Sequence, residues 1–227
     1  MIKLVAFDWN GTILSDAAAV SRADSATAKH FGFSGGTIEE YRATFTIPIR
    51  NYWIARGFDL KFFDRNAEKI HKYFLNQYEP LEDVCRSRAG TRPILAWLRK
   101  MRIKSVIYSN HIIPHIEKQL WRLELHGYVD KIMARPTSDD HSHMHNRFKQ
   151  LKLYDYVKKF KLKPKEVLLV GDTVEEIENA KYYGYYSVAL TGGHNSTVRL
   201  RAVNPDFLID NLNELKVIIP GLSRQRL

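Results

Sequence analysis

The sequence contains one cysteine, Cys85, among 227 residues. A single thiol excludes an intramolecular disulfide framework and a zinc site made of cysteines. No apolar run approaches the roughly 18 to 20 residues that a helix needs to cross a bilayer. The first residues also lack the long apolar stretch of a signal peptide, and the chain has no internal repeats or Gly/Ser linkers. We therefore expect a globular cytoplasmic protein without a membrane partner.

The charge of the chain is strongly unbalanced toward the positive side. Lys and Arg total 35 against 25 Asp and Glu, which gives a formal charge of +10. Residues 15–88 are almost neutral, with 11 basic and 10 acidic side chains, whereas residues 147–165 hold eight basic side chains against one acidic. Such an excess attracts anions, from nucleic acids to small phosphorylated molecules, without choosing among them.

Short apolar segments typical of buried strands alternate along the chain with helical patterns. Residues 93–102 and 151–160 carry apolar side chains at helical spacing. Because this alternation favours βαβ units, we predict an α/β fold with a doubly wound, mostly parallel, Rossmann-like sheet. The expected strands are residues 2–7, 105–108, 167–170, 185–190 and 207–209.

Residues 16–88 interrupt this alternation. Strand patterns are scarce there, and aromatic side chains are dense at spacings that fit helical faces. We interpret the segment as a helical insert after the first strand, with residues 1–15 and 89–227 forming the α/β core.

Polar side chains follow three of the predicted strands. Asp8 ends the first, Ser109 the second, and Asp172 ends the strand at 167–170. Because the carboxyl ends of parallel strands meet at one edge, where ligands bind, these side chains should share a crevice. Two carboxylates at such a short distance repel each other unless a cation lies between them. Hard oxygen ligands of this kind suit Mg²⁺. Hydroxyl groups such as those of Ser109 and Thr12 can donate hydrogen bonds to phosphate.

Four short motifs, in order, resemble those of the haloacid dehalogenase-like hydrolases. They are Asp8-Trp9-Asn10-Gly11-Thr12, Ser109-Asn110, a lysine upstream of the last motif, and Gly171-Asp172-Thr173. The insert is similar in place to the helical cap of that superfamily, and the segments 192–195 and 205–210 are similar to its phosphoglycolate phosphatase-like branch. The resemblance covers nearly the whole chain and implies a Rossmann-like core with a small helical cap at residues 16–88.

The resemblance also implies roles for individual residues. Asp8 is expected to attack phosphorus and form an aspartyl-phosphate, as nucleophilic carboxylates do. Mg²⁺ is expected to be held by Asp8, the backbone carbonyl of Asn10, and Asp172, with Glu176 supporting it through water. Ser109 is expected to bind the phosphoryl oxygens. The expected activity is that of a Mg²⁺-dependent phosphatase of a small phosphorylated metabolite.

The phosphate-site base and the other phosphate ligands have more than one candidate. Spacing to the last motif favours Lys149 as the base, with Lys152 and Arg147 as alternatives, and a solvated helix face is the ordinary place of a lysine. Thr12 and Asn110 are candidates for binding the substrate, in addition to the residues with expected catalytic roles.

Asn10 is the main departure from the family pattern. Phosphatases of the family usually carry an aspartate there, which protonates the leaving oxygen and later activates water. An amide donates hydrogen bonds but does not transfer protons, and general acid–base catalysis is worth about 10²–10⁴-fold in rate. We therefore expect slow hydrolysis of alkyl phosphates. Asp16 is either a substitute acid or a helix N-cap, and the N-cap is the favoured interpretation.

Two other branches of the superfamily fit the sequence poorly. Phosphonoacetaldehyde hydrolases have a motif similar to the one around Asp8, but they need a cap lysine for a Schiff base. Trp53 occupies the aligned position, and the nearest lysine is Lys61. The dehalogenase branch typically has a tyrosine near this position and needs no Mg²⁺, and the Asp-Trp-Asn and Gly-Asp-Thr motifs do not match it.

Two further segments carry candidate ligands. Residues 44–50 read as a loop between cap helices, where Arg50 either reaches an anionic group of the substrate or is a surface arginine that begins the next helix. His141, His143 and His145 are a candidate transition-metal site, although their spacing and the polar residues before them favour a solvent loop.

Two alternatives to the phosphatase stay open. Asn10 motivates a non-catalytic phosphate-binding protein, although Asp8, Ser109 and Asp172 are retained. The basic residues 147–165 motivate a nucleic-acid-related phosphatase, but this segment matches no nucleic-acid-binding motif. The sequence predicts neither the substrate, which the cap should select, nor the oligomeric state.

Overall fold

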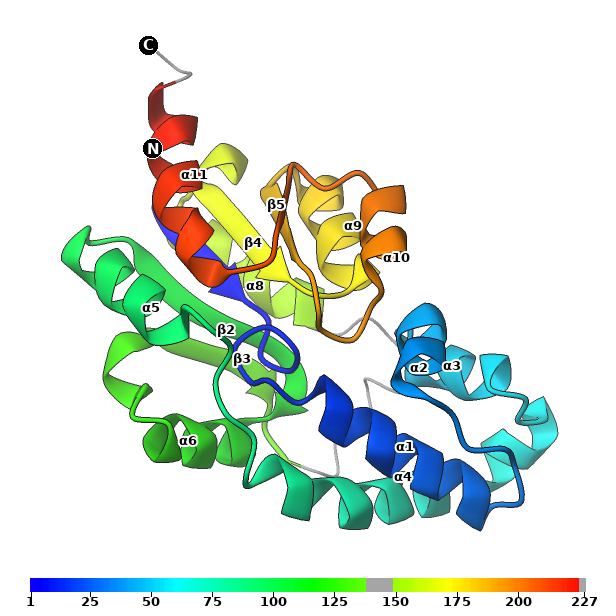
Figure 1. Cartoon of the computed structure of the whole chain (residues 1–227). Helices are drawn as coiled ribbons and strands as arrows, with labels where there is room; N and C mark the ends of the chain where they lie inside the picture. The colour runs from blue at the N-terminus through cyan, green and yellow to red at the C-terminus, as the bar shows by residue number, and fades with distance from the viewer. Residues whose placement is uncertain (138–148, 225–227) are drawn as a thin grey trace.

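The computed structural model describes residues 1–137 and 149–224 and contains a six-stranded sheet. Neighbouring strands run parallel in the order β3-β2-β1-β4-β5-β6, so β1 lies between β2 and β4 (Figure 1). This is the strand order of a doubly wound fold, and the predicted fold class is confirmed. The strands are β1 (Leu4–Phe7), β2 (Lys104–Ile112), β3 (Lys131–Arg135), β4 (Val167–Gly171), β5 (Tyr186–Leu190) and β6 (Phe207–Ile209).

Helices cover both faces of the sheet, as a parallel sheet requires. Side chains of β1 alternate between two cores, with Val5 and Phe7 in one and Leu4 and Ala6 in the other. Each fully buried aliphatic or aromatic side chain stabilises the fold by roughly 1.5–3 kcal/mol. The helices are α5 (Thr91–Lys100), α6 (Ile113–Arg122) and α11 (Leu215–Arg224) on the first core, α8 (Lys149–Lys159) and α9 (Val174–Tyr183) on the second, and α10 (Thr197–Ala202). Short 3-10 helices are η1 (His126–Tyr128), η2 (Pro164–Glu166) and η3 (Leu212–Glu214).

An all-helical insert separates β1 from α5. It comprises α1 (Ala17–His30), α2 (Ile38–Thr44), α3 (Ile49–Ala55) and α4 (Leu60–Glu82). The long helices α1 and α4 pack against each other (Figure 1). Buried aromatic side chains, among them Tyr41, Trp53 and Phe63, form a core that belongs to the insert alone. The predicted helical insertion after the first strand is confirmed.

Two strands differ from the sequence pattern. The pattern does not predict β3, because Lys131–Arg135 has only three apolar residues between two charged ends. The predicted second strand ends at Tyr108, whereas β2 continues to Ile112, so Ser109 and Asn110 lie inside a strand. Its pairing with β3 shifts register between Tyr108 and Ile112, and this irregularity depends on the neighbouring strand.

Among the helices in the described ranges, none is both long enough and apolar enough to cross a membrane.

Candidate active site

Asp8 lies directly after the central strand β1, at the carboxyl edge of the sheet. It is 6% exposed, and its backbone N–H donates to the carbonyl of Val170 on the neighbouring strand β4. Burial raises the pKa of Asp8 well above its ordinary value, Lys149 lowers it, and the charges of Glu176 and Asp172 raise it further. A nearby cation is therefore needed to keep the Asp8 carboxylate ionised.

Lys149 supplies part of that charge from the first residue of α8. Its Nζ lies 3.0 Å from Asp8 Oδ1 and 3.2 Å from Glu175 Oε2, and it also donates to Glu176. Burial opposes the charged form, but the three carboxylates outweigh it and hold the pKa of Lys149 well above its ordinary value. The ammonium group is thus a fixed positive charge beside Asp8.

The alternatives for this base do not occupy the same place. The Nζ of Lys152 donates to the backbone carbonyl of Ala134. Arg147 lies outside the described residues, as do His141, His143 and His145. Among the residues that the structure describes, the geometry therefore places Lys149, the favoured candidate, at Asp8.

Asp172 follows β4 and is fully buried. Its Oδ1 accepts a hydrogen bond from the Thr12 hydroxyl at 2.6 Å, and its Oδ2 accepts one from the backbone N–H of His194 at 2.6 Å. A side chain at Gly11 or Gly193 would collide with this carboxylate, so both positions need glycine. Thr12 was expected to bind phosphate, whereas the structure uses its hydroxyl to hold Asp172.

The acidic side chains at the sheet edge fit a magnesium ion. Asp8 and Asp172 offer hard carboxylate oxygens, and burial raises the pKa of both. With Asp16, Glu175 and Glu176, five buried carboxylates face Lys149 and His194, so the site keeps an excess of negative charge that a divalent cation would reduce. The donor set that would hold Mg²⁺ is Asp8, Asp172 and the backbone carbonyl of Asn10.

Glu176 has a second structural task at the start of α9. Its Oε2 accepts hydrogen bonds from the backbone N–H of Thr173 at 3.1 Å and from the Thr173 hydroxyl at 2.5 Å. This is a capping box, and the other carboxylate oxygen accepts from Lys149. Glu176 therefore positions Lys149, in addition to the predicted role near the metal.

The Asn10 side chain points toward the insert, where a network of polar groups holds it. Its Nδ2 donates to Asp16 Oδ2 at 2.7 Å and to the Tyr78 hydroxyl at 3.0 Å. Asp16 also accepts from the Tyr78 hydroxyl at 2.6 Å and from the Gly11 N–H at 2.7 Å. The amide of Asn10 is thus a donor to an anion, which an aspartate in the ionised form could not be.

Asp16 stands at the N-cap position of α1, but its carboxylate caps no helical N–H. The favoured N-cap interpretation is therefore wrong for the side chain, because Asn10, Tyr78 and Gly11 take its oxygens. Burial raises the pKa of Asp16, but hydrogen bonding to His194, Tyr78 and Asn10 outweighs it and lowers the pKa overall. An ionised Asp16 is a poor proton donor.

His194 is a site residue that the motif pattern does not single out. It is 4% exposed and lines the same cavity as Asp8. Its Nδ1 lies 2.7 Å from the Tyr41 hydroxyl, and its Nε2 forms an ion pair with Asp16 Oδ1 at 3.4 Å. Burial lowers the pKa of His194, but Asp16 and Asp172 outweigh it and raise the pKa to about 9. The sequence feature that could have indicated His194 is its position directly after Gly192-Gly193, in the segment 192–195 that resembles the phosphoglycolate phosphatase-like branch.

Ser109 and Asn110 reach the crevice from β2. Ser109 is 2% exposed, and its Oγ accepts a hydrogen bond from the His111 N–H at 3.0 Å. The Nδ2 of Asn110 donates to Glu175 Oε2 at 3.2 Å, and the backbone carbonyl of Asn110 accepts from Arg135 Nε at 2.6 Å. Both side chains line the cavity beside Asp8.

Arg50 does not join this group. It lies in the first turn of α3, and its guanidinium forms two hydrogen bonds with Asp64 on α4, at 2.9 and 3.0 Å. The side chain does not line the cavity. Of the two interpretations of Arg50, the structure matches a surface arginine that begins a helix, because Asp64 already satisfies its charge.

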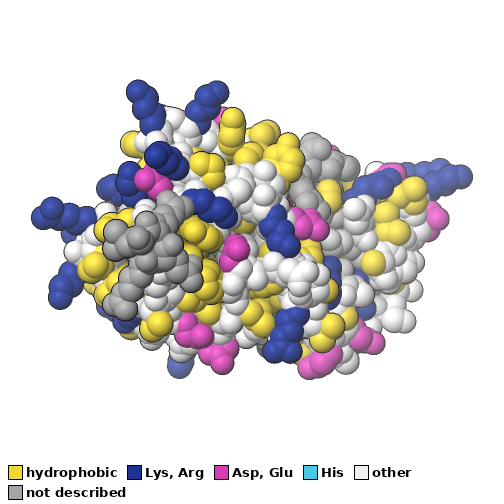
Figure 2. Space-filling model, turned by 90° about the horizontal axis from the view of Figure 1, so that it is seen from above, with side chains coloured by type: hydrophobic (Ala, Val, Ile, Leu, Met, Phe, Trp, Pro, Cys, Tyr) yellow, Lys and Arg dark blue, Asp and Glu magenta, His cyan; other side chains and the backbone are white. Residues whose placement is uncertain are grey.

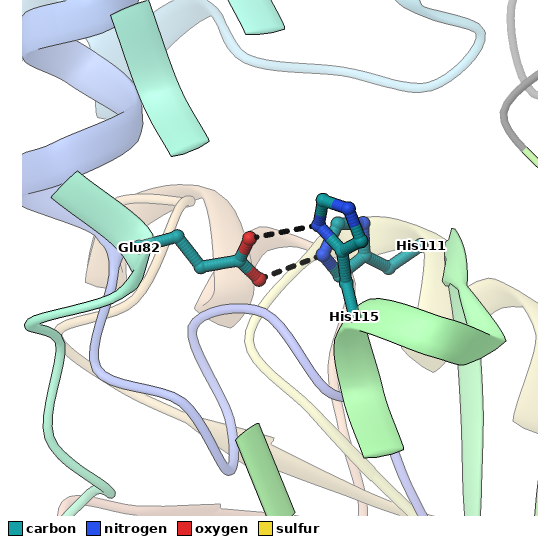
Figure 3. Close-up of side chains that lie close together, drawn as sticks. All are labelled: Glu82, His111 and His115. Atoms are coloured by element: carbon teal, nitrogen blue, oxygen red, sulfur yellow. Dashed lines mark hydrogen bonds and ion pairs between the residues drawn. The ribbon is translucent and has the colours of Figure 1, made fainter. Parts of the chain in front are cut away.

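A Glu–His cluster joins the end of the cap helix α4 to the core. Figure 3 shows Glu82 facing His111 and His115, with Oε1 2.7 Å from His111 Nε2 and Oε2 3.1 Å from His115 Nδ1. Glu82 is 1% exposed. Burial raises its pKa, but hydrogen bonds from both imidazoles outweigh it and lower the pKa to about 2. Among the described residues, these three form a group whose potential ligand atoms lie within 4.8 Å of one another.

A cavity of about 170 Å³ lies between the sheet edge and the insert. Asp8, Ser109 and Lys149 line its core end, and mostly aromatic and aliphatic side chains of α1 to α4 line the rest. The fold and the site together define a class: hydrolytic enzymes with a capped Rossmann-like core and a buried aspartate at the end of the first strand.

Comparison with known proteins agrees with this class. Residues 5–190 match the family model described as haloacid dehalogenase-like hydrolase. The chain belongs to that family, and the family and enzyme class predicted from its motifs are confirmed.

Relatives and structural neighbours cover almost the whole chain. Phosphoglycolate phosphatases from Pseudomonas putida and Vibrio vulnificus are each 24% identical to it; they cover 97% and 96% of this chain, which spans 80% and 96% of theirs. A haloacid dehalogenase-like hydrolase from Streptococcus pneumoniae has a TM-score of 0.78 at 17% identity, covering 96% of this chain and 98% of its own. CbbY from Rhodobacter sphaeroides, in complex with phosphate, has a TM-score of 0.69 at 18% identity, covering 95% and 96%.

Proposed function

We propose that the protein is a Mg²⁺-dependent phosphatase that cleaves a phosphate monoester through an aspartyl-phosphate on Asp8. The observation that carries the proposal is the placement of Lys149 3.0 Å from Asp8, in one crevice with Ser109. The names of the relatives, phosphoglycolate phosphatase, support the same reaction class.

The reaction begins at the Asp8 carboxylate. An Asp8 oxygen attacks phosphorus while the bond from phosphorus to the leaving oxygen breaks, and water then cleaves the aspartyl-phosphate to release inorganic phosphate. Ser109 and Asn110 donate hydrogen bonds to the phosphoryl oxygens, and Lys149 offsets the charge that develops on them. When bound, Mg²⁺ supplies further positive charge to the phosphoryl group and to the pair Asp8 and Asp172.

The residues at the position of the usual acid give the leaving oxygen little help. Asn10 cannot transfer a proton, and Asp16, with its lowered pKa, is ionised and already accepts several hydrogen bonds. The enzyme should therefore favour esters whose leaving group is stable as an anion.

Hydrolysis of p-nitrophenyl phosphate with Mg²⁺ tests the proposal directly. This leaving group needs no proton, so the wild-type protein should turn it over, and Asp8→Asn should abolish turnover. Asp210→Asn, a change of an exposed carboxylate away from the cavity, is the matched control. Activity that persists in Asp8→Asn would overturn the assigned nucleophile.

We also propose the domain division as residues 16–88 for the cap and residues 1–15 with 89–227 for the core. The chain passes between these parts twice, near residues 13–15 and 86–88, and the two segments are hydrogen-bonded to each other. The Ser15 N–H donates to the Arg86 carbonyl, and the Arg88 N–H donates to the Ile13 carbonyl. Paired linkers of this kind suit a hinge. Limited proteolysis should cut first at these crossings.

One alternative has a specific observation in its favour. The network around Asn10 and Asp16 supplies no proton, which suits a protein that binds phosphate and Mg²⁺ without turnover. Binding of both with no hydrolysis across a panel of phosphate esters, p-nitrophenyl phosphate included, would select this alternative.

The nucleic-acid alternative finds less support. On the face shown in Figure 2, Lys and Arg side chains stand apart, with Asp and Glu side chains between them. A nucleic-acid interface usually gathers its bases into one patch or stripe. Salt-sensitive oligonucleotide binding near physiological ionic strength would restore this alternative.

A further inference from the structure

The cavity above Asp8 is large enough for more than a phosphate group. Its volume is about 170 Å³, and a cavity of about 150 Å³ lined by aliphatic and aromatic side chains is known to bind benzene. The cavity is therefore of the size that holds one small ring, next to Asp8, Ser109 and Lys149, which would hold the phosphate.

The cap side of this cavity is apolar. Aromatic and aliphatic side chains of the four cap helices and of the loop between α2 and α3 contribute to its lining. Among them are Val20, Phe45, Ile49, Trp53, Phe74 and Leu75. Such a wall stabilises an uncharged hydrocarbon group by removing it from water. Polar groups of Asp24, Tyr41, Tyr52, His71 and Tyr78 also occur in the lining, but they are its minority.

The charges of the cap also disfavour an anionic substrate group. Within the described chain, no Lys or Arg of residues 16–88 lines the cavity. Arg42 donates to the carbonyls of Gly192 and Gly193, and Arg50 is paired with Asp64. The cap carboxylate that does line the cavity is Asp24, which is paired with Arg56 at 3.8 Å, so this pair presents no net positive charge to an anion.

The chemistry of the leaving group points the same way. Asn10 has no proton to transfer, and both carboxylate oxygens of Asp16 already accept hydrogen bonds, from Asn10, Tyr78 and Gly11. A phenol has a pKa of about 10, as in tyrosine, whereas the pKa of an alkyl alcohol is close to that of water and therefore far higher. An aryl oxide therefore leaves without a proton far more readily than an alkoxide.

We infer that the substrate is a phosphate monoester of an uncharged aromatic alcohol, with its ring in the apolar cap cavity. This inference rests on the proposed phosphatase function. The Asp8 oxygen forms the new bond to phosphorus, and the bonding electrons pass to the aryl oxygen, which takes a proton from solvent. Water then hydrolyses the aspartyl-phosphate, so the products are the phenol and inorganic phosphate.

Three esters separate the contribution of the ring from that of the leaving group. Phenyl phosphate tests the ring, 2-phosphoglycolate tests a small anionic substrate, and acetyl phosphate has a good leaving group but no ring. We expect kcat/KM for phenyl phosphate to exceed that for 2-phosphoglycolate by about 10- to 100-fold or more, the range that burial of one ring supplies.

A charge placed in the wall tests whether the cavity holds the ring. Leu75→Lys should lower kcat/KM for phenyl phosphate by about tenfold and leave acetyl phosphate nearly unchanged. Asn76→Lys is the matched control, because Asn76 is the next residue of α4, is exposed and does not line the cavity. Ala67→Leu, which narrows the same cavity, should act like Leu75→Lys if the latter folds poorly.

The outcomes distinguish the two claims. Asp8-dependent turnover of acetyl phosphate with a preference for 2-phosphoglycolate over phenyl phosphate would overturn the inference and leave the phosphatase function in place. A phenyl phosphate preference that both Leu75→Lys and Ala67→Leu leave intact would also overturn it, since the leaving group alone would explain the preference. No turnover of any of the three esters would overturn the phosphatase function itself.

Discussion

At the scale of single residues, Asn10 decides how protons move in this site. Its amide donates to Asp16 and Tyr78, and it therefore stabilises an ionised Asp16 that cannot serve as an acid. In the proposed mechanism, the leaving group therefore takes its proton from solvent.

Replacing Asn10 by aspartate should restore general acid catalysis. A carboxyl group there would face the ionised Asp16, and the neighbouring negative charge would raise its pKa and keep it protonated. We expect Asn10→Asp to raise kcat/KM for an alkyl ester such as ethyl phosphate by about 10²-fold, within the range of general acid catalysis. Rates on phenyl phosphate, measured in parallel, should change much less. Equal rates on ethyl phosphate before and after the change would mean that another group supplies the proton.

Lys149 is the second residue whose removal has a defined consequence. Lys149→Met should lower kcat by about 10²–10³-fold, as loss of one transition-state donor does. It also leaves Asp8, Glu175 and Glu176 without their shared cation, which should destabilise the fold by about 3–5 kcal/mol. The thermal midpoint and kcat should be measured together at a temperature where the variant is folded. Lys152→Met is the control, and a larger loss of kcat in that variant would contradict the assignment.

At the scale of elements, the Glu–His cluster fastens α4 to the core. Glu82 ends the longest cap helix, whereas His111 and His115 belong to β2 and α6 (Figure 3). Hydrogen bonding to Glu82 raises the pKa of His115, against an opposing effect of burial, with Glu79 and Lys118 as the other charges that face it. The cluster thus ties cap position to the protonation of these groups.

The contribution of this cluster to stability should depend on pH. The lowered pKa of Glu82, about 2 against an ordinary 4.5, stabilises the fold above pH 4.5 and is lost as the pH falls toward 2. The raised pKa of His115 stabilises it below the ordinary 6.5 and is lost at higher pH. The contribution should therefore be largest between about pH 4.5 and 6.5.

Urea unfolding of Glu82→Gln measures this contribution. We expect a loss of about 3 kcal/mol at pH 5.5, from the shift in the Glu82 pKa, and a smaller loss at pH 8.5. Glu68→Gln, a change of an exposed carboxylate on the same helix α4, should cost little at either pH. An equal loss for Glu82→Gln at both values would show that the cluster stabilises by packing alone.

At the scale of the whole molecule, the charge is arranged by domain. The cap is nearly neutral, and the core carries most of the excess of +10, while the crevice between them is acidic and suits a divalent cation. A core with net positive charge attracts phosphorylated anions over a long range, while the crevice itself stays acidic.

Binding of Mg²⁺ should stabilise the whole protein through this crevice. A ligand that binds only the folded state at 100 times its Kd stabilises it by about 2.7 kcal/mol. Thermal unfolding with saturating Mg²⁺ should therefore show a higher midpoint than with chelator. Asp172→Asn should abolish this difference, and Asp210→Asn should retain it. The same rise in midpoint for Asp172→Asn would place the Mg²⁺ site elsewhere.

Local patterns predict those parts of this protein that depend on local physics. The strand at β1 and the place of the helical insert follow from periodicity and composition, and Asp8 and Asp172 follow from motifs at strand ends. The pattern fails at β3, whose short, charge-flanked sequence becomes a strand only beside β2. It also fails at Asp16, because Tyr78, one of the donors to that carboxylate, lies 62 positions away in the chain.

The sequence by itself determined the fold class, the family and the motif residues at the sheet edge, because each motif and each periodic pattern consists of residues close together in the chain. Only the tertiary structure decided what surrounds them. Tyr78 meets Asp16 across 62 positions and Tyr41 meets His194 across 153, so no local signal could place them. The apolar cavity has the same origin: its wall is assembled from side chains of separate helices, which come together only when the cap packs over Asp8.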